Sequence, residues 1–324
     1  MEELLPSLPF RVEIEVTGKC NLSCANCYAQ PLSGFEPGFN GLTYIMQKTK
    51  DEANPFEVSL LGGEPFMRTD IIQVLNKAKN LFGSIVGVST NGTKFTTMPA
   101  SDLDKLKEIS DGTSFVQVSI DSLKPTINEV LRGRTAEVLK GINILERHEI
   151  PFSVSIVVSK QNLGDTLNTI KTLATDMQYA YSFNLNPIQL PNSNGNRHNL
   201  MVSSQEMSEL VKEARQVVSA SGKIIKAMGL DKPCEYFAPA LLDSYRLNTC
   251  LAGVFRACVL PDGNVSPCSL IRNGNLGNLY TESWRNIWAR SAERFKTLKG
   301  LQCESDNLTM LRVKGSEVSR VRSR

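Results

Sequence analysis

The chain of 324 residues is 41% hydrophobic, which is enough to bury the core of one large domain or of two ordinary ones. Its formal net charge of +3 argues against general attraction to nucleic acid or to a membrane surface. No apolar run approaches the roughly 20 residues of a membrane-spanning helix. Eight cysteines without a secretory signal segment predict a reducing compartment, so we expect a cytoplasmic protein that uses thiols as ligands.

Short runs rich in Val, Ile and Phe alternate with stretches of helical periodicity through the first part of the chain. The predicted buried strands are 11–16, 56–61, 85–89, 115–120, 152–158 and 181–186. The predicted helices are 43–52, 69–82, 101–109, 136–148 and 165–176. Such alternation is typical of right-handed β-α units around a parallel sheet. Six units are fewer than the eight of a closed barrel, so the predicted α/β fold is an open, partial (β/α)6 barrel of the TIM type.

The alternation stops after the sixth predicted strand. A segment rich in Pro, Asn, Ser and Gly follows at 187–199. Ser203 and Glu206 then form a capping-box pattern that predicts a helix, with Gly222 helping to end it. Short strands, turns and cysteines predominate afterwards. We therefore predict a barrel at 9–190, a linker with a helix at 191–249, a small α+β domain at 250–310 and a tail at 311–324.

Three cysteines follow the first predicted strand with the spacing C-x3-C-x2-C, at Cys20, Cys24 and Cys27. Three thiolates on one tight loop can bind three irons of a cubane iron–sulfur cluster and leave the fourth iron free to bind a small molecule. A structural zinc site is disfavoured because it needs four closed ligands, and no fourth cysteine or histidine is near in the sequence. A disulfide is disfavoured because the chain is long enough to build its own core. The spacing therefore predicts a reactive cluster.

Glycine-rich or polar motifs also follow the next three predicted strands. They are Gly-Gly-Glu-Pro at 62–65, Ser-Thr-Asn-Gly at 89–92 and Ser-Ile-Asp at 119–121. Each motif alone could be an ordinary turn or a helix cap. In parallel barrels, however, functional residues lie at the carboxyl ends of the strands. The coincidence of these motifs with the cysteine loop at one mouth therefore predicts a functional site.

The cysteine motif together with the Gly-Gly-Glu-Pro segment resembles the radical S-adenosylmethionine (radical SAM) superfamily, over roughly residues 9–190. The resemblance implies that Cys20, Cys24 and Cys27 bind a 4Fe-4S cluster, whose fourth iron is chelated by the amino and carboxylate groups of SAM. It implies further SAM contacts from Tyr28 near the adenine, from Gly62, Gly63 and Glu64 at the methionyl amino group, from Ser89, Asn91, Ser119 and Asp121 as polar contacts, and from Arg132 at the carboxylate. Arg132 could equally be a surface helix arginine, and Val157 could pack on the adenine or simply fill the barrel core.

The resemblance also implies a reaction. A reduced cluster gives one electron to the sulfonium of SAM, the S–C5′ bond breaks, and the resulting 5′-deoxyadenosyl radical abstracts a hydrogen from a substrate. The cofactors carry this chemistry, while the protein supplies orientation and a dry cavity. An electron donor such as flavodoxin or ferredoxin is the expected partner.

A second group of cysteines resembles the SPASM/twitch auxiliary-cluster domain. Asp262 and Gly263 predict a hairpin turn, Gly263 stands five residues before Cys268, and a Gly-Asn-Leu segment precedes a helix with two tryptophans. The resemblance implies that Cys250 and Cys268 bind an auxiliary 4Fe-4S cluster, with Cys303 as the candidate for the third ligand.

The cysteines of this region depart from the full SPASM pattern. Asp306 stands where a C-x2-C partner is expected, and no cysteine follows Cys303. We therefore predict one auxiliary cluster at most, whose fourth ligand is Cys258, Asp306, Cys234 or a substrate group. Cys258 could also be a small core residue and Cys234 a loop or core thiol, and the whole region could be a remnant that binds no cluster.

SPASM/twitch enzymes mostly modify peptides and proteins, or remodel small metabolites and tetrapyrroles. The chain begins almost directly with its first strand, so we expect no leader-binding domain, and we favour hydrogen abstraction from a peptide or protein residue that gives an oxidised or cross-linked product. Ser269 stands where some peptide-oxidising relatives carry an acid, which weakens a simple oxidation to an aldehyde. The alternatives are an enzyme of tetrapyrrole or metallocofactor biosynthesis and a non-catalytic iron–sulfur scaffold. The sequence identifies no residue that acts directly on the substrate.

Overall fold

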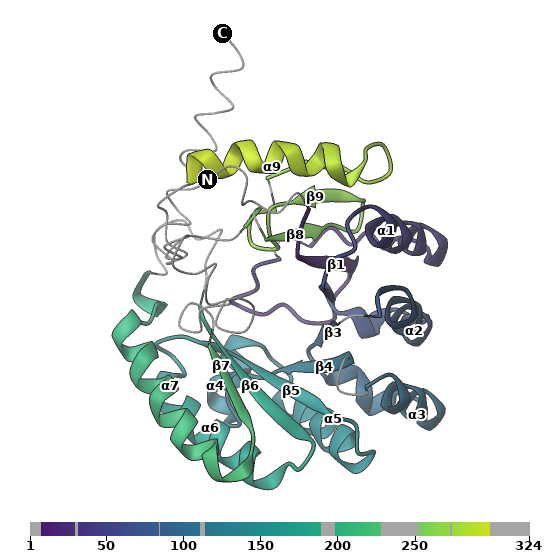
Figure 1. Ribbon diagram of the computed structural model, residues 1–324. Coiled ribbons are helices and arrows are strands. Elements are labelled where there is room, and N and C mark those ends of the chain that lie inside the picture. Colours follow the sequence, from purple (N-terminus) through teal and green to yellow (C-terminus); the bar gives the residue numbers. More distant parts are fainter. Residues whose placement is uncertain are drawn as a thin grey trace.

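The computed structural model describes residues 8–29, 32–83, 85–110, 114–188, 198–227, 252–253, 255–272 and 274–298. These residues form one curved ten-stranded sheet with the strand order β10-β9-β8-β1-β2-β3-β4-β5-β6-β7 (Figure 1). All neighbours from β8 to β7 are parallel, and the pairs β8-β9 and β9-β10 are antiparallel. Because β7 and β10 lie at opposite ends of this order, the sheet is open, as the partial barrel requires.

The six predicted strands are all present, and four further strands extend the sheet. Their bounds are β1 (Arg11–Thr17), β2 (Glu57–Gly62), β3 (Ile85–Thr90), β4 (Ser114–Ser119), β5 (Phe152–Val158), β6 (Ala180–Pro187), β7 (Ile224–Ala227), β8 (Arg256–Val259), β9 (Asn264–Ser266) and β10 (Gly277–Asn278). Strand β7 pairs in parallel with β6. It lies in the segment that we expected to contain only a linker and a helix, so the described part of that segment adds another unit to the barrel.

The predicted helices are confirmed, most of them within two residues at each end. Their bounds are α1 (Phe39–Glu52), α2 (Ile71–Phe82), α3 (Ala100–Ile109), α5 (Thr135–Arg147), α6 (Leu163–Asp176), α7 (Ser204–Val218) and α9 (Trp284–Leu298). Ser203 and Glu206 form the expected capping box at the start of α7, and Gly222 has the left-handed conformation expected at the end of this segment. The short helix α4 (Pro125–Leu131) was not predicted. Short 3-10 turns lie at η2 (Pro65–Met67), η3 (Thr93–Thr97), η4 (His198–Leu200) and η5 (Ser219–Ser221).

The two faces of the sheet differ in chemistry. Successive side chains of a strand point to opposite faces, and the aliphatic residues of β1 to β6 pack into the core beneath the outer helices. Figure 1 shows these helices along the outside of the curve. The alternate residues, which include Glu15, Gln117 and Asn184, face inward and are mostly polar. A sheet of this kind buries its core outside the strands and leaves a polar interior.

The C-terminal region continues the barrel sheet instead of forming a separate one. Strand β8 pairs in parallel with β1, and β9 turns back beside β8 through the predicted hairpin at Gly263. Helix α9 packs against α1, where the indole N–H of Trp284 donates to Thr49 Oγ1 over 3.1 Å and its backbone N–H donates to the Glu52 carboxylate over 2.7 Å. The barrel and the described part of the C-terminal region therefore share one continuous sheet.

Several residues singled out in the sequence lie outside the described residues. They are Cys234, Cys250, Cys303, Asp306 and the tail at 311–324. Among the helices that the structure describes, none has the length and apolar character needed to cross a membrane.

Candidate cluster and cofactor site

The three cysteines of the motif lie on the loop that leaves the carboxyl end of β1. All three are half-buried. The thiol of Cys24 donates to the carbonyl oxygen of Arg132 over 3.6 Å, and the backbone N–H of Ala25 donates to the carbonyl oxygen of Leu131 over 3.0 Å. The cysteine loop is thus fixed against the carboxyl end of α4, the helix that the sequence did not predict.

The three thiols lie close together, because charges on Cys27 and Cys20 would both raise the pKa of Cys24. In the described residues, no three His, Cys, Asp or Glu side chains converge on a point where one metal ion could bind. A cubane does not need such convergence, because each corner iron takes its own cysteine. Burial raises the pKa of Cys20, and it raises the pKa of Cys24 to about 11. Since a cluster binds thiolates, its assembly here must displace protons from these cysteines.

The glycine pair after β2 lies directly against the cysteine loop. A Cβ atom on Gly63 would stand 2.1 Å from the carbonyl oxygen of Lys19 and 3.0 Å from Cβ of Cys20. Gly62 has φ +148° and leaves equally little room against the carbonyl oxygen of Thr17. The backbone N–H of Gly63 donates to that oxygen over 2.8 Å. Only glycine allows the two segments to approach this closely.

Glu64 joins the ends of β2 and β3. Its carboxylate accepts hydrogen bonds from the Thr90 hydroxyl (2.6 Å), from the backbone N–H of Asn91 (2.6 Å) and from that of Phe66 (3.0 Å). The residue is 1% exposed. Burial raises the pKa of Glu64 to about 6 in spite of these hydrogen bonds. Both carboxylate oxygens are therefore engaged inside the protein. A contact of this segment with the methionyl amino group of SAM stays a prediction.

Asn21, which the sequence analysis missed, connects the cysteine loop to the end of β3. Its Nδ2 donates to Thr93 Oγ1 over 2.9 Å, and its Oδ1 accepts from Asn91 Nδ2 over 2.9 Å. Asn91 Oδ1 in turn accepts from the backbone N–H and the hydroxyl of Thr93 over 3.0 and 2.7 Å. Asn91, which we expected near the cofactor, therefore lies beside the cysteine loop. Only its position between two candidate ligands could have drawn attention to Asn21.

Asp121 and Arg132 form a buried ion pair at the same edge. Asp121 Oδ2 lies 2.7 Å from Arg132 Nε, and Asp121 Oδ1 accepts from the backbone N–H of Val157 over 2.8 Å. The Arg132 side chain is only 14% exposed, so its interpretation as a surface helix arginine is wrong. Asp121 holds the end of β5 and Arg132 in place. Direct contact of either residue with SAM stays a prediction.

The remaining cofactor candidates lie on the inner face of the sheet. Ser119 is half-buried and stands opposite Ser155 on β5. Ser89 is half-buried and accepts from Gln117 Nε2 over 3.1 Å. Val157 is also half-buried, in contrast to its fully buried neighbours on β5.

Tyr28 lies near β1, the strand that pairs with β8 of the C-terminal region. Burial and the nearby carboxylates of Glu15 and Glu13 raise the pKa of Tyr28. Glu15 forms an ion pair with Arg272, whose Nη2 lies 3.0 Å from Glu15 Oε2. Glu13 accepts from the backbone N–H of Ser269 over 3.4 Å. These charged residues connect the cysteine loop of the barrel to the segment after β9.

The two described cysteines of the C-terminal region are both buried. Cys258 on β8 stands between Glu13 on β1 and Ser266 on β9 in the strand register, and Cys268 follows β9. Burial raises the pKa of Cys258 well above its usual value, and a charge on Cys268 would raise it further. Both thiols could serve a cluster, but the other two expected ligands lie outside the described residues. Cys258 also fits its alternative role as a small core residue.

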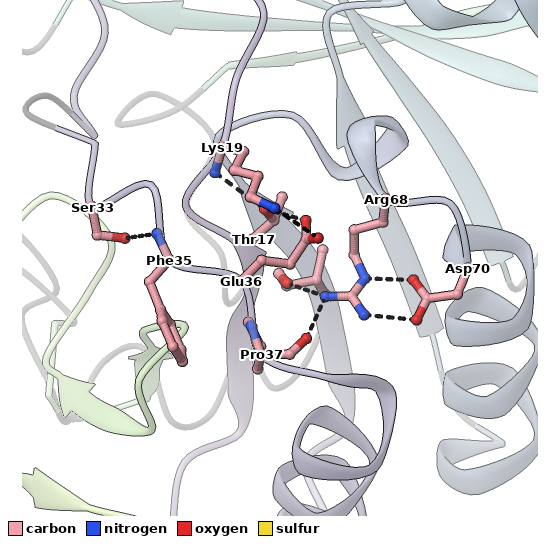
Figure 2. A network of polar contacts seen from close by, with 9 residues as sticks. Thr17, Lys19, Ser33, Phe35, Glu36, Pro37, Arg68 and Asp70 are labelled. Atoms are coloured by element: carbon pink, nitrogen blue, oxygen red, sulfur yellow. Dashed lines mark hydrogen bonds and ion pairs between the residues drawn. The ribbon is translucent and has the colours of Figure 1, made fainter.

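A buried arginine braces the segments on either side of the cysteine loop, and Figure 2 shows its hydrogen bonds to Asp70 and Pro37. Arg68 donates through Nε and Nη2 to the carboxylate of Asp70 (2.8 Å each), and its Nη1 donates to the carbonyl oxygens of Val16 (2.9 Å) and Pro37 (2.8 Å). It thereby joins the end of β1, the segment before α1 and the start of α2. Nearby, Lys19 pairs with Glu36 over 3.2 Å at the surface.

Replacing Arg68 with lysine should cost about 2–4 kcal/mol of unfolding free energy, because one ammonium cannot replace four guanidinium hydrogen bonds inside the protein. Urea unfolding followed by circular dichroism measures this cost. Lys19→Ala is the control, since its half-exposed ion pair should contribute less than about 1 kcal/mol. Equal losses in the two variants would show that Arg68 does not brace this loop.

Two family models match parts of this chain. A model of the radical SAM superfamily matches residues 14–173, and a model of the iron–sulfur cluster-binding SPASM domain matches residues 250–310. AlbA, the subtilosin biosynthesis protein of Bacillus subtilis, is 25% identical in an alignment of 314 positions that covers 89% of this chain and 63% of AlbA. The AdoMet-dependent heme synthase of Methanosarcina barkeri is 26% identical over 91% of this chain and 86% of its own length.

Solved structures share the fold at low identity. SuiB of Streptococcus suis, solved with S-adenosylmethionine, superposes with a TM-score of 0.68 at 18% identity, over 87% of this chain and 66% of SuiB. The enzyme anSMEcpe with bound AdoMet and a peptide gives a TM-score of 0.64 at 18% identity, over 89% of this chain and 82% of that protein. The chain thus spans about two thirds of the length of AlbA and SuiB. The two family matches identify the chain as a member of the radical SAM superfamily with a C-terminal SPASM iron–sulfur domain.

Proposed function

We propose that the protein cleaves SAM reductively and uses the resulting 5′-deoxyadenosyl radical to oxidise or cross-link a residue of a peptide or protein. The observation that carries this proposal is the meeting of the cysteine loop with Gly63, Asn91 and Asp121 at the carboxyl edge of the parallel strands. Two relatives from Bacillus subtilis support the proposal, the bacteriocin subtilosin biosynthesis protein AlbA and the sporulation killing factor maturation protein SkfB. SuiB has also been solved with its precursor peptide SuiA.

In this proposal the residues of the chain bind and orient the cofactors. Cys20, Cys24 and Cys27 hold the cluster, which when bound supplies the electron that splits SAM. Glu64 and Asn21 keep the ends of β2 and β3 against the cysteine loop, so that a bound molecule meets a fixed surface. The carboxyl edge of the strands is preorganised for the cofactors, because these hydrogen bonds form within the protein itself.

The auxiliary site is the second part of the proposal. Cys258 and Cys268 lie on and after the β8-β9 ribbon that joins the barrel at β1. With Cys250 and Cys303 they would complete a ligand set for one cluster. A flavodoxin or ferredoxin is the electron donor that we propose, and the cytoplasm is its compartment.

An enzyme of tetrapyrrole or metallocofactor biosynthesis is the second candidate. The heme synthase favours it, because the chain covers 86% of that relative but only 63% of AlbA. A non-catalytic iron–sulfur scaffold is a weaker candidate. It would not need the close approach of Gly62 and Gly63 to the cysteine loop.

The test is an anaerobic reaction of the reconstituted protein with SAM, dithionite and a set of candidate peptides. The proposal expects 5′-deoxyadenosine and a peptide that has lost pairs of hydrogen atoms, both detected by mass spectrometry. Cleavage of SAM with modification of a tetrapyrrole in place of the peptide would favour the second candidate. A cluster that never cleaves SAM would favour the scaffold.

A further inference from the structure

The inner face of β3 to β6 is polar but carries no charge. None of these four strands contains Asp, Glu, Lys or Arg. Their inward residues include Ser89, Gln117, Ser155, Asn184 and Asn186, which are hydroxyl and carboxamide side chains. The alternate residues are mostly aliphatic and lie in the core under the outer helices. The inner surface is therefore rich in groups that both donate and accept hydrogen bonds.

These side chains are joined across the curve of the sheet. Gln117 Nε2 donates to Ser89 Oγ over 3.1 Å, and Gln117 Oε1 accepts from Asn184 Nδ2 over 2.5 Å. The second bond connects β4 to β6 across β5, so the two amides meet inside the curve. Asn186 Nδ2 donates to Ser155 Oγ over 3.1 Å. We call these five residues the amide ladder.

Part of the hydrogen-bonding capacity on this face is unused. Asn184 Oδ1 and the hydroxyl of Ser182 are buried and have no hydrogen-bond partner among the residues that the structure describes. Ser182 is 0% exposed and lies on the same side of β6 as Asn184. Buried polar atoms in native proteins are paired with protein, water or ligand. The unpaired Asn184 Oδ1 and Ser182 hydroxyl beside the amide ladder thus leave hydrogen-bonding capacity for water or a polar ligand.

The ladder is partly exposed on the inner face of the sheet and is bordered on one side by an aromatic ring. Ser89, Gln117 and Asn184 are half-buried, whereas their outward neighbours are almost fully buried. Below the ladder, the ring of Phe115 covers Gly87, where a Cβ atom would stand 2.3 Å from the ring. Above it, the same strands end in the residues that surround the cofactor site. A molecule on the ladder would therefore lie between an aromatic floor and that site.

The uncharged carboxamide and hydroxyl groups of the ladder favour an uncharged polar ligand. Carboxamides and hydroxyls pair with uncharged amide groups, whereas carboxylates such as the propionates of a tetrapyrrole are matched by Arg or Lys. The described acids on the inner face of β1 are already engaged, Glu15 with Arg272 and Glu13 with Arg11. We infer that the amide ladder binds backbone or side-chain amides of a peptide substrate, with Gln117 and Asn184 as specificity-determining residues. The inference rests on the proposed function and names the groups that recognise its substrate.

The test measures binding without turnover. The reconstituted holoenzyme with SAM and no reductant is dialysed to equilibrium against an equimolar library of N-acetylated, C-amidated hexapeptides, and retained peptides are counted by mass spectrometry. Gln117→Leu and Asn184→Leu should retain about tenfold less peptide than the wild type, because each removes the hydrogen bonds of one amide. The iron content should not change, and it serves as the check that each variant is folded.

Two further variants make the result specific. Gln205→Leu makes the same substitution on the exposed surface of α7 and should retain as much peptide as the wild type. Gln117→Glu keeps the size of the side chain but adds a charge, and it should also lower retention. Wild-type retention by Gln117→Leu and Asn184→Leu, or increased retention by Gln117→Glu, would overturn the ladder while leaving the proposed function in place. Retention of coproporphyrin instead of any hexapeptide by the wild type would overturn the proposed function and the inference with it.

Discussion

Replacing Cys24 with alanine should remove about four irons per chain and abolish the formation of 5′-deoxyadenosine. A cubane needs all three thiolates to hold three of its corners, and the loop offers no replacement in the described residues. The Cys24 thiol is also fixed by the carbonyl oxygen of Arg132, so its position is part of the fold. Iron and sulfide are counted after anaerobic reconstitution, and 5′-deoxyadenosine is measured by liquid chromatography.

The control for this variant lies one residue away. Ser23 is exposed on the same loop, so Ser23→Ala should keep the full iron content and the activity. A Cys24→Ala protein that kept all its iron would remove this residue from the ligands. If iron fell but 5′-deoxyadenosine still formed, another cluster would have to be the one that meets SAM.

Replacing Gly63 with alanine should lower the affinity for SAM by at least about tenfold. The new methyl group would stand 2.1 Å from the carbonyl oxygen of Lys19, which belongs to the backbone and cannot swing away. The cysteine loop or the segment after β2 must then move, at a cost of about 1–3 kcal/mol. Each 1.4 kcal/mol by which this movement destabilises the SAM-bound protein lowers the affinity for SAM about tenfold. Equilibrium dialysis with labelled SAM measures the effect on the reconstituted protein.

Gly164→Ala is the matched substitution, because a Cβ atom there meets nothing within 4 Å and its φ is not in the left-handed region. This variant should bind SAM as the wild type does. A Gly63→Ala protein with unchanged affinity and unchanged iron content would show that the close approach of the two loops does not shape the cofactor site.

The periodicity of the sequence predicted most of the barrel for a simple reason. Buried parallel strands are short apolar runs, and the helices between them bury one stripe, so both patterns are visible in single residues. Helix α4 was missed because seven residues are too few for a periodic pattern. Strand β7 was missed because it is four residues long, and its alternate side chains Ile224 and Lys226 are exposed.

Site residues that belong to a short sequence motif could be predicted. Residues whose contacts are distant in the sequence were missed. Cys24, Gly63 and Glu64 belong to compact motifs whose chemistry is readable from adjacent residues. The contacts of Asn21 with Thr93 and of Arg68 with Pro37 join segments that only the fold brings together. An isolated asparagine or arginine gives no such signal in the sequence.

The inner face of the barrel illustrates the same limit. The alternation of β4 and β6 could have shown that Gln117 and Asn184 point away from the core. It could not have shown that the two amides meet, because their strands are separated by β5 and the bond depends on the curvature of the sheet. The curvature of the sheet depends on how all the helices and strands pack together, so no short sequence pattern encodes it.

The central claim is that the cysteine loop carries a cluster with one iron open to SAM. Electron–nuclear double resonance on the reduced, oxygen-protected holoprotein, with SAM labelled by 15N at the methionyl amino group, tests it most directly. We predict a hyperfine coupling from that nitrogen to the cluster, which disappears in Cys24→Ala. Zinc bound in the loop, or a reduced cluster whose spectrum shows no coupling to the labelled nitrogen, would contradict the claim.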